Sequence, residues 1–172
     1  MKRLLLATAV SLLTATSAMA QTVYIVRHAE KVDAPGDPDP ALSEAGEARA
    51  ALLADVLRDA HPVLVLTSPM QRTRLTAAPT ADYHSASSEA VSLEGGGAAH
   101  VAATVARVRA LPEDAVVLVV GHSNTVPAIA RALGYAEAAD MPECEYDRMT
   151  RLILEGGAVQ AVVSRYGAPS DC

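Results

Sequence analysis

Basic residues are scarce in this chain of 172 residues, which has 14 lysines and arginines against 20 aspartates and glutamates, a net charge of −6. Nucleic acids and anionic membranes bind extended basic surfaces, so the composition argues against both as general partners. A few arginines gathered in one pocket could still reverse the local potential and hold a small anion. A small anionic ligand is therefore the partner class that the composition leaves open.

Cysteine is rarer still, with Cys144 and Cys172 as the only two. Their wide spacing does not match a zinc ribbon. An exported protein could join them in a disulfide, but the Cα separation that a bridge requires cannot be read from the sequence. The sequence leaves the pairing open.

Long apolar runs are also missing, and the N-terminal one is too short for a membrane anchor. Residues 2–3 are basic, residues 4–13 are apolar, and small residues lead up to Ala20. This is the layout of a secretory signal peptide, whereas a spanning helix needs ~20 apolar residues. We expect residues 1–20 to be a cleaved signal peptide and residues 21–172 to form one domain. The expected location is periplasmic or secreted, without membrane contact after cleavage.

Four apolar segments rich in β-branched residues predict strands that are buried on both faces. A fifth segment follows Gly156 and Gly157, a pair that suits a tight hairpin and places the last two strands antiparallel at an edge. The five predicted strands are residues 22–26, 63–67, 115–120, 151–155 and 158–164.

Helical patterns lie between these strands, at residues 44–60, 70–81, 100–111 and 124–133. Ser43 is the expected N-cap of the first helix, Ser68 and Pro69 an N-cap and first-position pair for the second, and Gly134 the end of the fourth. The alternation predicts an α/β three-layer sandwich, with a mostly parallel sheet, helices on both faces and an antiparallel C-terminal edge hairpin.

In the first predicted helix, five apolar residues recur at helical spacing and are expected on its inner face: Ala45, Ala48, Leu52, Leu53 and Val56.

Three further segments have the composition of loops. Residues 33–40 and 85–97 are rich in turn-forming residues and are expected to be loops. The charged residues 143–149 fit a solvated loop better than the rim of a pocket.

Polar side chains follow three of the predicted strands. Arg27 and His28 end the first, Arg72 lies one turn into the helix after the second, and His122 ends the third. Ligands in open α/β sheets bind outside the carboxyl ends of the strands, so these residues should meet there. Two guanidinium groups suit phosphate oxygens, and a neutral imidazole can be a nucleophile. The pattern points to phosphoryl transfer.

Four segments in the same order resemble the histidine phosphatase superfamily, also called the phosphoglycerate mutase-like family. "RHAEK" resembles its RHG-type motif, with Ala29 where glycine is commoner. The other three segments are "LSEAGEARA", "TSPMQRTRLTA" and "VVGHSNTVPAIARAL", which resemble its LT-x-x-G-x-x-QA helix, its SP-x-x-R-A-x-x-TA segment and its second-histidine segment. The chain looks like a small exported branch of this family.

The resemblance implies a histidine acid phosphatase-like hydrolase of phosphoric monoesters or of another small phosphorylated substrate. By similarity, His28 would accept the phosphate as phosphohistidine, while Arg27, Arg72 and His122 would hold the phosphate oxygens and stabilise the transition state. The family needs neither a metal nor another cofactor.

The acid that protonates the leaving group is not fixed by the motifs. Family members commonly use a carboxylate after the SP-x-x-R helix, and Glu94 in "SLEGGG" is the best placed, because the glycines allow a close approach. Glu89, Asp37, Asp39 and Glu30 stay open as alternatives.

Rival interpretations have less support. "GHSNT" resembles a serine nucleophile elbow, but no histidine follows Ser123 as that triad order requires. A metal hydrolase is a second rival, but the sequence does not contain the H-E-x-x-H spacing that would support it. The remaining alternative is a protein of the same fold that binds phosphate or a phosphorylated ligand with little or no turnover.

Overall fold

The computed structural model describes residues 19–170 and 172. The predicted signal peptide, apart from its last two residues, lies outside this part of the chain and stays a prediction. None of the helices in the described residues has the length and apolar character needed to cross a membrane.

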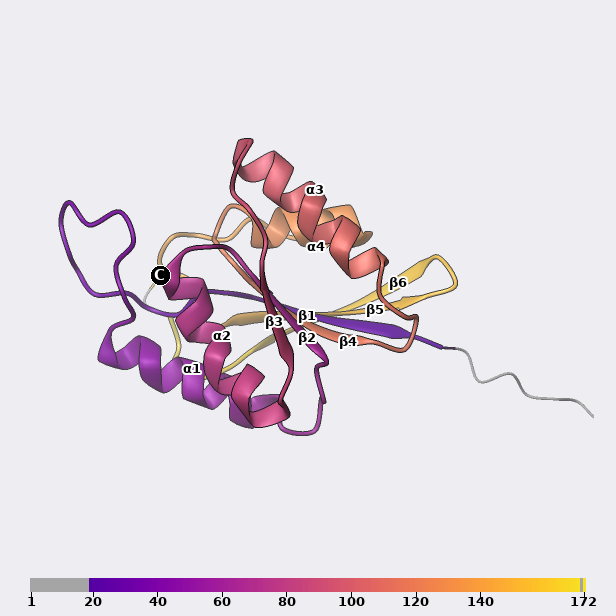
Figure 1. The fold of residues 1–172 in the computed structure, drawn as a ribbon, viewed down its shortest axis with the longest axis horizontal. Helices are drawn as coiled ribbons and strands as arrows, with labels where there is room; N and C mark the ends of the chain where they lie inside the picture. The colour runs from indigo at the N-terminus through magenta and orange to yellow at the C-terminus, as the bar shows by residue number, and fades with distance from the viewer. Residues whose placement is uncertain (1–18, 171) are drawn as a thin grey trace, which may run out of the picture.

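A single six-stranded sheet forms the centre of the molecule (Figure 1). The strand order is β3-β2-β4-β1-β5-β6. The first four strands are parallel to one another, β5 runs antiparallel to β1, and β6 runs antiparallel to β5. This confirms the predicted α/β class, the mostly parallel sheet and the C-terminal edge hairpin. The strands are β1 (Gln21–Arg27), β2 (Leu64–Thr67), β3 (Ser87–Ala90), β4 (Val116–Gly121), β5 (Arg148–Glu155) and β6 (Ala158–Arg165).

Helices cover both faces of the sheet. α1 (Glu44–Val56) and α2 (Gln71–His84) lie on one face, and α3 (Gly96–Arg109) and α4 (Val126–Leu133) on the other (Figure 1). Alternate residues of each central strand enter opposite cores: Ile25 of β1 packs with α4, whereas its neighbour Val26 packs with α1 and α2. Because both faces are buried, the strands read as continuous apolar runs.

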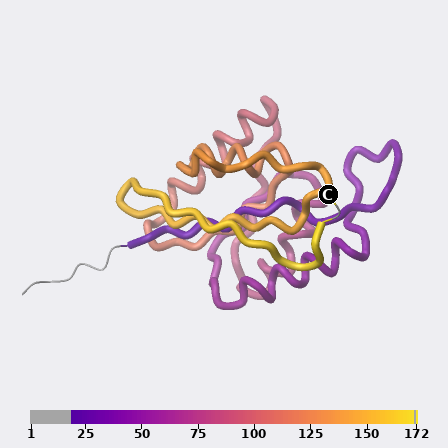
Figure 2. The backbone as a smooth tube through the Cα atoms, turned by 180° about the vertical axis from the view of Figure 1, so that it is seen from behind, coloured from indigo at the N-terminus to yellow at the C-terminus, as the bar shows by residue number. Residues whose placement is uncertain are grey.

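The carboxyl ends of the parallel strands point to one end of the sheet, and the chain terminus returns there. From behind, the C-terminal segment runs from the yellow hairpin to the same end as the loop that follows β1 (Figure 2). Cys172 is joined to Cys144 by a disulfide with Cα atoms 5.5 Å apart, within the usual range. The question that the sequence left open is therefore answered.

The segment expected to be a loop at residues 85–97 contains two regular elements. Ser87–Ala90 forms β3, an edge strand parallel to β2, and α3 begins at Gly96, four residues before its predicted start. The strand was missed because its side chains are mostly exposed at an edge, so no apolar run marks it. The helix was missed because its first turn contains two glycines.

The start of α2 also differs from the prediction. The helix begins at Gln71, and Ser68 is not its N-cap. The Asp39 carboxylate instead accepts hydrogen bonds from the Gln71 backbone N–H at 2.9 and 3.0 Å. A carboxylate at this position satisfies a free helix donor and complements the helix dipole. Ser68 is thereby free for another contact, described below.

The inner face of α1 was only partly predicted. Ser43 caps the helix through Gly46 N–H. Of the five predicted apolar positions, Leu53 is buried, whereas Ala45, Ala48, Leu52 and Val56 are exposed. Arg49 is buried instead, because it forms an ion pair with Glu30 and donates to the carbonyls of Tyr166 and Ala168. A paired arginine therefore occupies a helix position that hydrophobic spacing alone cannot identify.

Candidate active site

One pocket of about 440 Å³ lies at the carboxyl ends of β1, β2 and β4. It brings together the four residues that the strand-end pattern selected: Arg27, His28, Arg72 and His122. The rings of the two histidines are 5.4 Å apart between centroids. Residues separated by nearly a hundred positions in the chain thus share one cavity because parallel strands end at the same edge.

His28 is buried at the floor of the pocket, with 4% of its surface exposed. Its Nδ1 lies 2.8 Å from the carbonyl oxygen of Ala29. A carbonyl only accepts, so Nδ1 carries the hydrogen and Nε2 keeps its lone pair in the neutral ring. Burial, helped by the nearby charges of Arg27 and Arg72, lowers the His28 pKa to about 3. The imidazole is therefore neutral near pH 7.

Arg27 is held by the loop of residues 142–146. Its Nη1 donates to the carbonyl oxygens of Pro142, Glu143 and Glu145, and its guanidinium lies over the Tyr146 ring at 4.2 Å. Nη2 donates to the Glu143 carboxylate at 2.8 Å. The Nε donor is buried and has no hydrogen-bond partner among the described residues. A buried donor without a partner is costly, and a bound anion would satisfy it.

Arg72 repeats this arrangement on α2. Its Nη1 donates to Asp39 Oδ1 at 3.3 Å, and its Nε is buried without a partner in the described part of the chain. Asp39 thus fixes both the first residue of α2 and the arginine that follows it. Two arginines, each with an unused buried donor, line the same pocket.

His122 is oriented by the residue that was predicted to cap α2. Its Nε2 lies 2.9 Å from Ser68 Oγ, and Ser68 Oγ in turn contacts Thr73 Oγ1 at 3.0 Å. The His122 backbone N–H donates to Thr125 Oγ1 at 2.9 Å. Burial lowers the His122 pKa to about 4, with Arg72 as the largest charge contribution. Like His28, it is neutral near pH 7.

The expected acid Glu94 does not line the pocket. It is exposed in the turn before α3, where Gly95 and Gly96 both have positive φ angles. The alternatives are engaged elsewhere or lie outside: Glu89 pairs with Arg107, Glu30 with Arg49, Asp39 with α2, and Asp37 accepts from the Asp39 N–H in the exposed loop. None of these five carboxylates borders the cavity.

The carboxylate that does border the cavity is Glu143. It accepts from Arg27 Nη2 at 2.8 Å and also from Ser123 Oγ. The segment that the sequence favoured as a solvated loop is therefore part of the pocket wall. The charge of this segment drew attention to it in the sequence. The placement of Glu143, however, depends on a contact with Arg27, more than 100 positions away in the chain, which no local pattern reveals.

Metal binding finds no obvious place in this arrangement. The described residues contain no group of three or more histidine, cysteine, aspartate or glutamate side chains placed to hold an ion. The two arginines in the pocket would also repel a cation.

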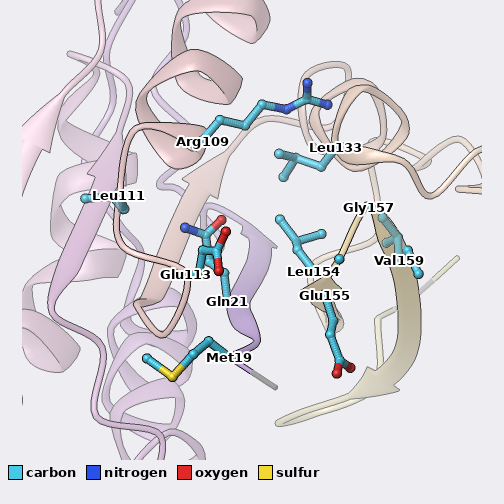
Figure 3. A pocket seen from close by; sticks show the side chains of 12 residues that line it. Met19, Gln21, Arg109, Leu111, Glu113, Leu133, Leu154, Glu155, Gly157 and Val159 are labelled. Atoms are coloured by element: carbon cyan, nitrogen blue, oxygen red, sulfur yellow. The ribbon is translucent and has the colours of Figure 1, made fainter. Parts of the chain in front are cut away.

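A second hollow of about 390 Å³ lies at the opposite end of the sheet. Figure 3 shows Arg109, Leu133, Leu154 and Val159 around it, with Gln21 at the start of β1. It contains none of the predicted site residues. Its polar groups are few and mixed in charge, and Arg109 donates to the Ala132 carbonyl.

Comparison with known proteins agrees with the geometry of the first pocket. Residues 23–94 match the profile of the histidine phosphatase superfamily, branch 1. The solved structure of a candidate phosphohistidine phosphatase SixA from Nakamurella multipartitia is 29% identical, with a TM-score of 0.61, over 87% of this chain and 96% of that one. The chain is thus similar to the histidine phosphatase superfamily in sequence over residues 23–94 and to a solved structure of this kind over most of its length.

Two further similarities point in the same direction. The protein histidine phosphatase SixA complexed with tungstate has the same fold, with 24% identity and a TM-score of 0.66 over 84% of this chain and 96% of that one. The uncharacterized protein Rv0525 of Mycobacterium tuberculosis is 43% identical over 67 residues. That match covers 36% of this chain and only 33% of the relative.

The superfamily profile covers only part of the pocket. Arg27, His28 and Arg72 lie inside the matched residues, whereas His122 and Glu143 lie beyond them. The fold supplies the second histidine, because β4 pairs with both β1 and β2 and therefore ends beside them.

Proposed function

We propose that this protein belongs to the histidine phosphatase superfamily and is a phosphatase that acts through a phosphohistidine on His28. One observation carries the proposal: a buried neutral imidazole faces a pocket in which two arginines each keep an unpaired Nε donor. Phosphoryl transfer is mostly positioning and electrostatic stabilisation, and donors that are fixed in advance supply much of the rate.

The nucleophile is His28 Nε2. The bond from Nδ1 to the Ala29 carbonyl fixes the tautomer and points the lone pair of Nε2 away from that carbonyl. Nε2 attacks phosphorus, an N–P bond forms, and the bond from phosphorus to the leaving group breaks with its electron pair. Water then attacks phosphorus, the electron pair of the N–P bond returns to Nε2, and phosphate is released.

The remaining pocket residues bind the transferred group. Arg27 and Arg72 hold its equatorial oxygens, where negative charge is spread during transfer. His122, fixed by Ser68, lies close enough to His28 to contact the same group.

The substrate is a small phosphorylated molecule or a phosphorylated side chain. Support comes from two similar solved structures, a candidate phosphohistidine phosphatase SixA and a protein histidine phosphatase SixA that holds tungstate, an oxyanion like phosphate. Phosphomonoester hydrolysis of the histidine acid phosphatase type, after export guided by residues 1–20, is the more specific form of this proposal. A protein of this fold that binds phosphate without turnover is the alternative.

A pair of identical substitutions tests the proposal. Purified protein is mixed with a radiolabelled phosphomonoester and quenched in alkali, in which phosphohistidine survives. Wild type should carry label and turn the substrate over, and His28→Asn should do neither. His61→Asn is the control, because His61 is exposed and its positive φ suits asparagine. Tight phosphate binding by a wild type without label or turnover would decide for the binding protein.

A further inference from the structure

The proposed phosphatase still needs a group that protonates the leaving oxygen. An alkoxide is a poor leaving group, so a positioned acid typically contributes about 10²–10⁴-fold to its departure. The five carboxylates that the sequence offers for this role lie outside the cavity. Glu143 is the carboxylate that lines it.

The position of Glu143 matches the direction in which a leaving group departs. His28 is buried at the floor of the pocket, whereas the Glu143 side chain is 83% exposed at its mouth. In-line transfer puts the leaving oxygen on the side of phosphorus opposite the attacking nitrogen. The leaving oxygen therefore points from His28 toward the mouth, where the Glu143 carboxylate lies.

The contacts of Glu143 also explain how it gives way to substrate. In the empty pocket its oxygens accept from Arg27 Nη2 and Ser123 Oγ. These are donors that a phosphate group would also use, and a dianion competes for them more strongly than a carboxylate does. The backbone of residue 143 stays in place during the exchange, because its carbonyl accepts from Arg27 Nη1. Only the side chain has to turn.

We propose that Glu143 is the general acid and base of the reaction, an inference that rests on the proposed function. Once the substrate has displaced Glu143 from Arg27, the free carboxylate takes up a proton from solvent. In the first step this proton passes to the leaving oxygen as the P–O bond breaks, leaving a carboxylate again. In the second step that carboxylate takes a proton from the water that attacks the phosphohistidine. One proton leaves and one returns, so the enzyme is restored without a further reactant.

Leaving groups of different quality test this role. Glu143→Gln should lower kcat/KM for ethyl phosphate by about 100-fold. For 2,4-dinitrophenyl phosphate, whose leaving oxygen needs no proton, the loss should be within about 3-fold. Labelling of His28 by the dinitrophenyl substrate should persist. Tungstate affinity and the melting temperature show whether Arg27 and its loop are intact in the variant.

Glu94→Gln is the matched control, the same chemical change on a carboxylate outside the pocket. It should leave kcat/KM for both substrates unchanged. The inference fails if Glu143→Gln changes kcat/KM for both substrates by the same factor, whether as an equal loss or as an equal gain from the release of Arg27. It also fails if Glu94→Gln causes the selective loss of kcat/KM for ethyl phosphate. A wild type that neither labels His28 nor hydrolyses either substrate would instead overturn the proposed function, and this inference with it.

Discussion

The two ends of the sheet carry hollows of similar size, about 440 Å³ and about 390 Å³, but they are built differently. At the carboxyl end, buried Arg27 of β1 converges with the half-buried side chains of Arg72 on α2 and His122 just after β4. Each of the three is held by a hydrogen bond to a neighbouring loop or strand. At the opposite end, apolar side chains lie among Arg109, Glu113 and Glu155, whose charges differ in sign (Figure 3). Size alone therefore does not identify a site, whereas convergent buried donors do.

Replacing one arginine at each end by alanine should give the largest difference between the two ends. Arg72→Ala removes an unpaired donor from the first pocket and should lower kcat/KM by about 10²–10³-fold, as loss of a transition-state donor does. Arg109→Ala at the opposite end should stay within about two-fold. Steady-state kinetics on one phosphomonoester checks both. Equal losses, or an Arg72 variant close to wild type, would mean that the two ends do not differ in function.

The disulfide adds a second difference, because it fixes only the pocket end. Cys144 lies in the loop that holds Arg27, and its bridge to Cys172 closes a separation of 28 residues. Replacing both cysteines by serine should lower the free energy of unfolding by about 3–4 kcal/mol. Urea denaturation measures this change. Dithiothreitol should destabilise wild type by a similar amount and leave the double variant unaffected.

Two helical glycines at the pocket end differ in the space around them, and substitutions there test how tightly this end is packed. A Cβ on Gly46 would lie 2.0 Å from the Glu30 carbonyl oxygen, whereas one on Gly97 would meet only Asn124 Nδ2 at 3.9 Å. Gly46→Ala should therefore lower the free energy of unfolding by about 1–3 kcal/mol. Gly97→Ala should raise it by up to about 1 kcal/mol through helix propensity. Thermal melting of the pair gives the sign of each change.

The pocket end should also make the stability of the protein depend on pH. His28 and His122 have pKa values of about 3 and about 4 in the folded protein, against 6.5 ordinarily. Between these values the unfolded chain binds protons that the folded chain does not, so stability should fall as the pH falls from about 6.5 toward 4. Urea titrations across this range test it, and His28→Asn should make the slope shallower. A slope unchanged by that substitution would remove His28 as its source.

The sequence predicted the parts of the site that lie on central strands. β1 and β4 are buried on both faces, so the polar residues at their ends stand out against apolar runs. β3 was not predicted, because an exposed edge strand has no such contrast. The wall around Arg27 was not predicted either, since it consists of backbone carbonyls from residues 142–145, and carbonyls carry no sequence signal. Arg49 was hidden for a related reason, because its burial depends on Glu30.

The bond between Cys144 and Cys172 also bears on how the protein is made. Arg27 is synthesised early, yet the loop that supplies its carbonyl acceptors is tied to residue 172. A ribosome-bound chain therefore carries His28 and Arg27 before the disulfide can secure their surroundings. The disulfide can form only after synthesis has passed residue 172 and an oxidant has acted on both thiols, so this tie on the pocket wall is a late event.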